Sequence, residues 1–246
     1  MITLSPRSRS PPAPDRVLVG VMSTVAVDPR AARRLGVRVE LAPREWWALR
    51  WISEQDAVRR DVVAHVLGGP EPLASDQTRR VVDRWRRAGL IERERLLAAG
   101  PPVCWLTSTG LRLVGAQHRP RTPTVGRLDH LHAVSLVRLG LERRGGRGWT
   151  SERGLHRQRR RADEHVADGR YVAPNGTVTA VEVELTVKAG RRLRGIVDDL
   201  TIEYTAVLYV VRGAAVRRGV ERAVDALGER RRVAVVNLAQ FQLDAR

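Results

Sequence analysis

Residues 75–91 read SDQTRRVVDRWRRAGLI, and their spacing predicts a helix with one apolar and one basic side. Ser75 is expected to cap the start of this helix, and Gly89 is expected to end it in a left-handed conformation. The residues on the apolar side, which should pack on a core, are Thr78, Val81, Val82 and Trp85. The basic side suits the major groove of DNA, because Arg binds guanine and Gln binds adenine there through paired hydrogen bonds.

The segments around this helix predict further elements in a recognisable order. In chain order they are helices at 46–54 and 57–67, a turn at 68–72, a strand at 90–97, a turn at 98–102, a strand at 103–106 and a short helix at 111–114. This order is typical of a winged helix-turn-helix, which would occupy residues 41–115.

The candidate DNA contacts lie on the predicted recognition helix and on the first strand of the wing. Arg93 and Arg95 are two residues apart, so they should point to the same face of that strand. The full candidate set is Gln77, Thr78, Arg79, Arg80, Arg84, Arg93 and Arg95. The alternative is a small helical domain for protein contacts, with an Arg-rich face in solvent.

The composition favours a polyanionic partner and a reducing compartment. The 246 residues carry a formal net charge of +17, and neutralising phosphates with such a surplus releases counterions. Almost all of the positive charge is Arg, which a GC-rich genome also favours. The single cysteine, Cys104, excludes a disulfide framework and a zinc site built on paired cysteines. No apolar run is long enough to span a membrane, so a cytoplasmic, nucleoid-associated protein is expected.

The chain divides into five segments by composition. They are a disordered basic arm at 1–16, a docking segment at 17–40, the winged helix at 41–115, a linker at 116–124 and a second domain at 125–246. The elements expected in the second domain are a helix at 125–143, strands at 149–152, 166–172 and 177–185, a helix at 188–204, a strand at 205–211, a helix at 214–227 and a strand at 232–238. This alternation predicts an α/β domain with a partly parallel sheet.

The predicted hairpin of the second domain carries three carboxylates. Glu182 and Glu184 are two residues apart on a strand, so they should face the same side, and pairing of the hairpin would bring Asp168 near Glu182. Converging carboxylates suit Mg²⁺ or Mn²⁺, which can activate water against a phosphodiester. The alternative is that Glu182 and Glu184 pair with Arg residues of 157–161 or 191–194 on a solvated face, where each ion pair contributes ~0–1 kcal/mol.

A winged helix followed by this carboxylate pattern resembles the replication-relaxation family, proteins of actinobacterial plasmids and other mobile elements. The resemblance implies an α/β fold, α+β overall, with a PD-(D/E)XK endonuclease-like domain after the winged helix. It also implies that Asp168 and Glu182 hold a metal and that a lysine follows the Glu by two residues. Here Glu184 stands at that position, and the sole lysine, Lys188, lies four residues beyond it. If the domain is active, the catalytic set would be Asp168, Glu182, Glu184 and Lys188.

Three functions remain open from the sequence. The first is sequence-specific binding of double-stranded DNA, as a homodimer, to regulate transcription or plasmid replication. The second is a metal-dependent endonuclease to which the winged helix delivers DNA. In the third, the second domain is a dimerisation or partner-docking module. Neither a P-loop nor a G-x-S-x-G motif is present, which argues against ATP-driven work and Ser-His-Asp catalysis. His130 and His132 are i, i+2 on a helix, so they are not expected to bind one metal together.

Overall fold

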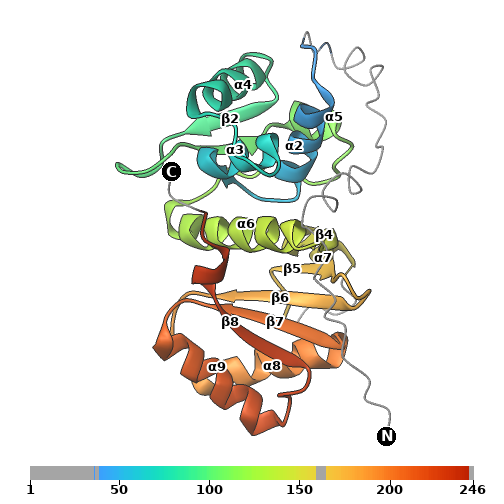
Figure 1. Cartoon of the computed structure of the whole chain (residues 1–246), viewed down its shortest axis with the longest axis vertical. Helices are drawn as coiled ribbons and strands as arrows, with labels where there is room; N and C mark the ends of the chain where they lie inside the picture. The colour runs from blue at the N-terminus through green and yellow to red at the C-terminus, as the bar shows by residue number, and fades with distance from the viewer. Residues whose placement is uncertain (1–35, 37–38, 159–164, 244–246) are drawn as a thin grey trace, which may run out of the picture.

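The computed structural model describes residues 36, 39–158 and 165–243, which form a mixed α/β fold. An N-terminal part (residues 39–115) lies on one side of a long helix, and the large sheet of the C-terminal part (residues 125–243) lies on the other (Figure 1). The expected basic arm and most of the expected docking segment lie outside the described residues.

The N-terminal part combines helices with a small antiparallel sheet. In chain order it contains α2 (Pro43–Ser53), β1 (Val58–Arg59), α3 (Arg60–Gly68), α4 (Ser75–Arg87), β2 (Ile91–Glu94), β3 (Val103–Leu106) and α5 (Ser108–Leu113). The strands pair in the order β1-β3-β2. The helices pack around the fully buried side chains of Trp51 and Trp85. Each such side chain buries about 150–250 Å².

Several local expectations are confirmed here and others are wrong. Strand β3 has the predicted bounds, and Gly89 has a φ of +68° just after α4. Ser75 is not the cap: it is the first residue of α4, Ala74 precedes it, and no side chain caps the helix. The helix predicted at 57–67 begins later, because Val58 pairs with Cys104 in β1 before the chain turns into α3.

The C-terminal part is built on a sheet of five strands. In chain order it contains η2 (Val125–Arg127), α6 (Leu128–Arg143), β4 (Arg147–Ser151), α7 (Glu152–Gln158), β5 (Gly169–Val172), β6 (Val178–Glu184), α8 (Gly190–Glu203), β7 (Ala206–Val211), α9 (Ala214–Leu227), β8 (Val233–Asn237) and η3 (Leu238–Phe241). The strand order is β4-β5-β6-β7-β8. The first three strands are antiparallel and the last three are parallel, as expected.

The sheet has a separate core on each face. Val181 and Val183 of β6 join the core that also contains α6, whereas Ala180 joins the core formed with α8 and α9. Side chains alternate along a strand, so Glu182 and Glu184 share the α8 side with Ala180. This alternation decides where the carboxylates of β6 lie.

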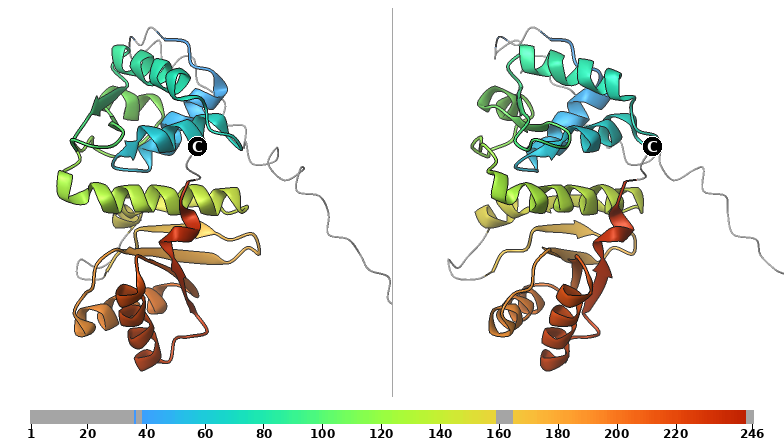
Figure 2. Two further views of the ribbon diagram at one scale, coloured as in Figure 1. Left: turned by 60° about the vertical axis from the view of Figure 1, so that its left-hand side comes forward. Right: turned by 90° about the vertical axis from the view of Figure 1, so that its left-hand side faces the viewer.

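Helix α6 is buried on two sides, whereas the spacing of Leu128, Leu131, Val134, Val137 and Leu141 predicts an apolar stripe on one side. It lies between the N-terminal helices and the sheet in every view (Figures 1 and 2). Its buried positions run around the helix and comprise Leu128, Leu131, Ala133, Val134, Ser135, Leu136, Val137, Arg138, Leu139 and Leu141. One apolar core therefore runs from the N-terminal helices through α6 to the sheet.

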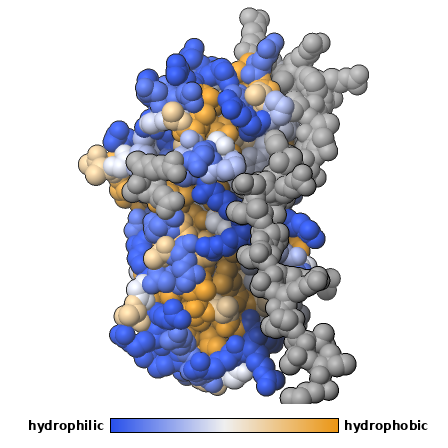
Figure 3. All heavy atoms as spheres, viewed as in Figure 1, coloured by the Kyte–Doolittle hydropathy of each residue, from blue (hydrophilic) through white to orange (hydrophobic). Residues whose placement is uncertain are grey.

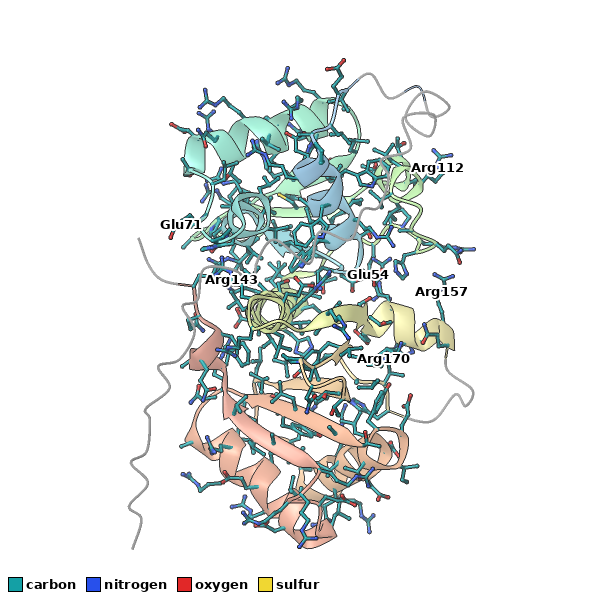
Figure 4. All side chains as sticks on the ribbon, turned by 45° about the vertical axis from the view of Figure 1, so that its right-hand side comes forward. Glu54, Glu71, Arg112, Arg143, Arg157 and Arg170 are labelled. Atoms are coloured by element: carbon teal, nitrogen blue, oxygen red, sulfur yellow. The ribbon has the colours of Figure 1, made fainter. Side chains whose placement is uncertain are left out.

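Polar contacts also cross the boundary between the N-terminal part and the C-terminal part. The buried Arg138 donates to the Trp51 carbonyl oxygen at 2.9 Å, and its guanidinium lies 4.2 Å from the centre of the Trp51 ring. Figure 4 shows Glu54 near the same boundary, where Ser151 donates to it at 3.0 Å. Although burial alone would raise the pKa of Glu54, contacts with His118 and Ser151 and the charge of Arg138 lower it to about 2. The boundary thus holds a permanently charged carboxylate at neutral pH.

Candidate nucleic-acid interface and carboxylate cluster

Helix α4 presents a basic outer face above its buried side. Figure 3 shows hydrophilic residues covering the end of the molecule where α4 lies. The exposed polar side chains of the helix are Ser75, Asp76, Gln77, Arg79, Arg80, Arg86 and Arg87. Of these, Arg79 forms an exposed ion pair with Asp76 at 3.2 Å. The face therefore offers Gln77 and several guanidinium groups to a partner.

Other predicted DNA contacts have partners inside the chain. Thr78 is 1% exposed, and its hydroxyl donates to backbone oxygens one turn earlier, so it belongs to the packed side of α4. Arg84 pairs with the buried Glu45 of α2, and Arg93 pairs with Asp83 of α4. Arg95 donates to the Gly100 carbonyl oxygen at 2.9 Å and closes the turn between β2 and β3. These four residues stabilise the N-terminal part in this arrangement.

The carboxylate cluster, defined as Asp168, Glu182 and Glu184, lies where β5 begins and β6 ends. Asp168 immediately precedes β5, and its Oδ2 accepts the backbone N–H of Val183 at 2.7 Å. Its Oδ1 lies 2.8 Å from Nε2 of His130 on α6. One carboxylate thus extends the β5–β6 ladder and joins the sheet to α6.

Glu182 and Glu184 are both 3% exposed, so the expectation of a solvated face is wrong. Nε2 of His165 lies 3.0 Å from Glu182 Oε2. Nζ of Lys188 lies 2.5 Å from Glu184 Oε2 and 4.0 Å from Glu182 Oε1. Among the described residues, the basic side chains beside these buried carboxylates are therefore a histidine and the sole lysine of the chain.

Burial and mutual repulsion control the charge of the cluster. Burial, followed by the nearby charge of Asp168, raises the pKa of Glu182 to about 7. Burial alone would lower the pKa of His130 and of His165, but Asp168 and Glu182 respectively reverse the shift and raise both values. The cluster therefore favours bound cations, because each added positive charge relieves the repulsion between carboxylates.

The donor chemistry of the cluster fits a hard divalent cation, since all three acids offer carboxylate oxygens. The side chains do not yet surround a common point: no group of three or more His, Cys, Asp and Glu within the described ranges is arranged to hold a metal. The Lys188 ammonium lies against Glu184 instead. A metal held by Asp168 and Glu182 would require Lys188 to withdraw from this carboxylate pair.

Tyr209 completes the surroundings of the cluster. Strand β7 runs parallel to β6 with Tyr209 directly beside Glu182, so both side chains share the α8 side of the sheet. The ring is fully buried, and its hydroxyl has no hydrogen-bond partner among the described residues. Burial, together with the charges of Glu182 and Glu184, raises the pKa of this hydroxyl far above its usual value. It therefore remains a neutral donor.

The sequence pointed to the three acids and to Lys188, but not to the parts played by His130, His165 and Tyr209. His130 contacts Asp168 only because α6 packs beside the start of β5. Tyr209 stands in an apolar strand, and its place beside Glu182 depends on the register of a parallel pair. No local signal gives either arrangement, whereas Lys188 follows Glu184 by only four residues and contacts it.

Comparison with known proteins leaves the family open: no family model, curated protein or solved structure matches this chain. None of the helices in the described ranges is long and apolar enough to cross a membrane.

Proposed function

We propose that this chain binds double-stranded DNA through α4, in a sequence-specific manner, to regulate transcription or plasmid replication. The observation that carries the proposal is the outer face of α4, where Gln77, Arg79, Arg80, Arg86 and Arg87 are exposed while Trp85 anchors the helix in the core. Such a helix can enter the major groove without unfolding its support. The order of three helices and a β-hairpin agrees with the winged helix-turn-helix expected from the sequence.

The hairpin contributes less charge than expected. Arg93 is paired with Asp83, and no charged residue occurs between Arg95 and Val103 in the turn. Base contacts therefore fall mainly to α4, and Arg80 is a good test residue because it is exposed and central on that helix.

Fluorescence anisotropy with duplexes selected from a random library tests DNA binding. Arg80→Ala should weaken binding to the selected site by ~1–3 kcal/mol and relax specificity, because a base-reading Arg is lost. Arg222→Ala, an exposed Arg of α9, serves as the matched control and should bind like the parent protein. Equal affinity of Arg80→Ala and the parent for all duplexes would contradict the role of α4.

Metal-dependent DNA cleavage is a second candidate, favoured by the position of the sole lysine. In a chain with 44 Lys and Arg residues, the only Lys contacts the buried carboxylate pair. An ammonium is a compact point charge on a flexible stem, unlike the planar guanidinium, so it suits a site where a cation must move. The α/β build of the C-terminal part, with β6, β7 and β8 parallel, is also compatible with the endonuclease-like domain that the resemblance implies.

Each residue of the cluster would have a separate role in this cleavage. Asp168 and Glu182 would hold the metal, which supplies an activated water and charge neutralisation at a phosphodiester. His130 and the Val183 N–H fix the Asp168 carboxylate. Lys188, once released from Glu184, would place its positive charge near the anionic substrate.

Incubation with supercoiled plasmid tests cleavage, with Mg²⁺, Mn²⁺ or EDTA present. The parent should nick DNA only with metal, and Glu182→Gln should not, because it removes a buried anionic ligand. A plasmid that stays intact in both metals, although the protein binds it, would leave DNA binding as the function and remove the cleavage candidate.

A further inference from the structure

The Tyr209 hydroxyl is a buried polar group without a partner in the part of the chain that the structure describes. Buried hydroxyls are normally hydrogen-bonded, and an exception calls for a bound ion, a water or a functional arrangement. Phenylalanine would fill the same space without this cost. The hydroxyl therefore points to a second arrangement of its surroundings in which it is satisfied.

The acceptor side chains beside Tyr209 on the neighbouring strand are carboxylates. Tyr209 packs among apolar side chains of the core between the sheet and α8, including Leu200 and Val207. Beside it in β6 stands Glu182, with Glu184 one step further on the same face. At present the Glu184 carboxylate is taken by Lys188.

We propose that Tyr209 is a positioning residue, whose hydroxyl holds the Glu182–Glu184 carboxylate pair when a divalent cation replaces the Lys188 ammonium. This inference rests on the cleavage candidate above. The entering cation repels Lys188, and withdrawal of the ammonium leaves a carboxylate oxygen without a contact. The tyrosine hydroxyl donates to that oxygen, and no proton is gained or lost by Tyr209. The Tyr209 hydroxyl thus replaces the Lys188 ammonium as the partner of the carboxylate, inside the same buried space.

The test is Mn²⁺ binding, followed by the electron paramagnetic resonance signal of free Mn²⁺, with no DNA present. Tyr209→Phe should lower Mn²⁺ affinity about 10- to 100-fold, the usual effect of losing a group that orients a metal ligand. Its melting temperature should equal or exceed that of the parent, because the substitution removes only an unpaired hydroxyl. Tyr204→Phe, another buried tyrosine of the same core but outside the cluster, is the matched control and should keep the parent affinity.

The outcomes separate the two proposals. If the parent binds Mn²⁺, Glu182→Gln does not, and Tyr209→Phe binds as tightly as the parent, the positioning role is wrong while the metal site stands. If the parent itself binds no Mn²⁺, the cleavage candidate and the role of Tyr209 are both wrong. A loss shared equally by Tyr209→Phe and Tyr204→Phe would indicate a general effect on the core and would also overturn the positioning role.

Discussion

At the scale of single residues, His132 shows how the boundary between the two parts controls a charge. Burial, followed by the nearby charge of Arg59, lowers the pKa of His132 to about 4. Arg212 acts in the same direction, whereas Asp61 and Asp129 oppose it. His132 is therefore a neutral side chain of the folded protein at physiological pH.

This shift predicts a pH-dependent loss of stability. The unfolded chain titrates His132 near the ordinary value of 6.5, so between about 6.5 and 4 it binds a proton that the folded chain does not. The free energy of unfolding should fall as the pH decreases through this window. His132→Gln should show a smaller fall between pH 7.5 and pH 4.5 in urea unfolding, because glutamine does not titrate. An identical pH dependence in both proteins would contradict the assigned shift.

The backbone conformation and burial of single residues were predictable where they depend on neighbours in sequence. Gly89 takes the left-handed conformation that ends α4, and Thr78 and Trp85 are buried as the helical spacing indicates. The missed contacts, such as Arg84 with Glu45, join elements far apart in the chain. Their geometry depends on how α2 packs on α4, which no single-segment pattern encodes.

At the scale of elements, α6 depends on one buried cation. Arg138 is held by Glu142 at 2.8 Å, by the Trp51 carbonyl oxygen and by the Trp51 and Trp149 rings, which lie on opposite sides of the boundary. These contacts offset the rotamer entropy lost when such a long side chain is ordered, which costs up to ~2 kcal/mol.

Arg138→Met should destabilise the protein. The Trp51 carbonyl oxygen would keep only the Glu54 N–H at 3.3 Å and would lose the shorter bond from the guanidinium, and a hydrogen bond from a charged group contributes ~1.5–3 kcal/mol. The contacts of the guanidinium with Glu142 and the rings would also be lost. Arg222→Met on the exposed face of α9 should leave stability unchanged. The comparison needs only urea unfolding curves at one pH, and equal midpoints for the two variants would contradict the structural role of Arg138.

Elements with one clear apolar side were predicted best. Helix α9 has the bounds expected from the sequence, because Val216, Val220, Ala223 and Val224 form its buried side. No helix was expected at α7, since Leu155 is its one buried residue. The two-sided burial of α6 was also missed. A helix rich in Leu and Val has the same sequence pattern whether one side or two sides of it are packed against other elements.

At the scale of the whole molecule, the chain forms one body around α6. The apolar core joins α2 and α3 to α6 and to the inner face of the sheet. In addition, Asp56 forms ion pairs with Arg121 of the expected linker, Arg127 of η2 and Arg153 of α7. On the other side of the segment at 116–124, Arg153 and Arg157 of α7 donate to Arg119 and Gln117. The segment is thus bound to both parts, in contrast to a free linker.

Thermal unfolding of the whole chain should accordingly show a single cooperative transition. Removal of the N-terminal part, leaving residues 125–246, would expose one apolar side of α6 to water, so this fragment should bind the dye ANS strongly and aggregate. Calorimetry and dye binding measure both effects. Two separate transitions in the whole chain, or a well-folded fragment with no dye binding, would contradict a shared core.

The hydrogen bond from the Val183 N–H to Asp168 affects how position 168 can change during evolution. If the proposed cleavage is correct, a lineage that no longer needed it would still be selected to keep an oxygen acceptor at position 168, because the strand ladder relies on it. Asparagine would satisfy that need, whereas alanine would not. An ancestral Asp at this position would therefore outlast the activity itself, and Lys188, which no backbone group requires, would be the first to drift to arginine. The order of such changes among descendants would show when the proposed cleavage was lost.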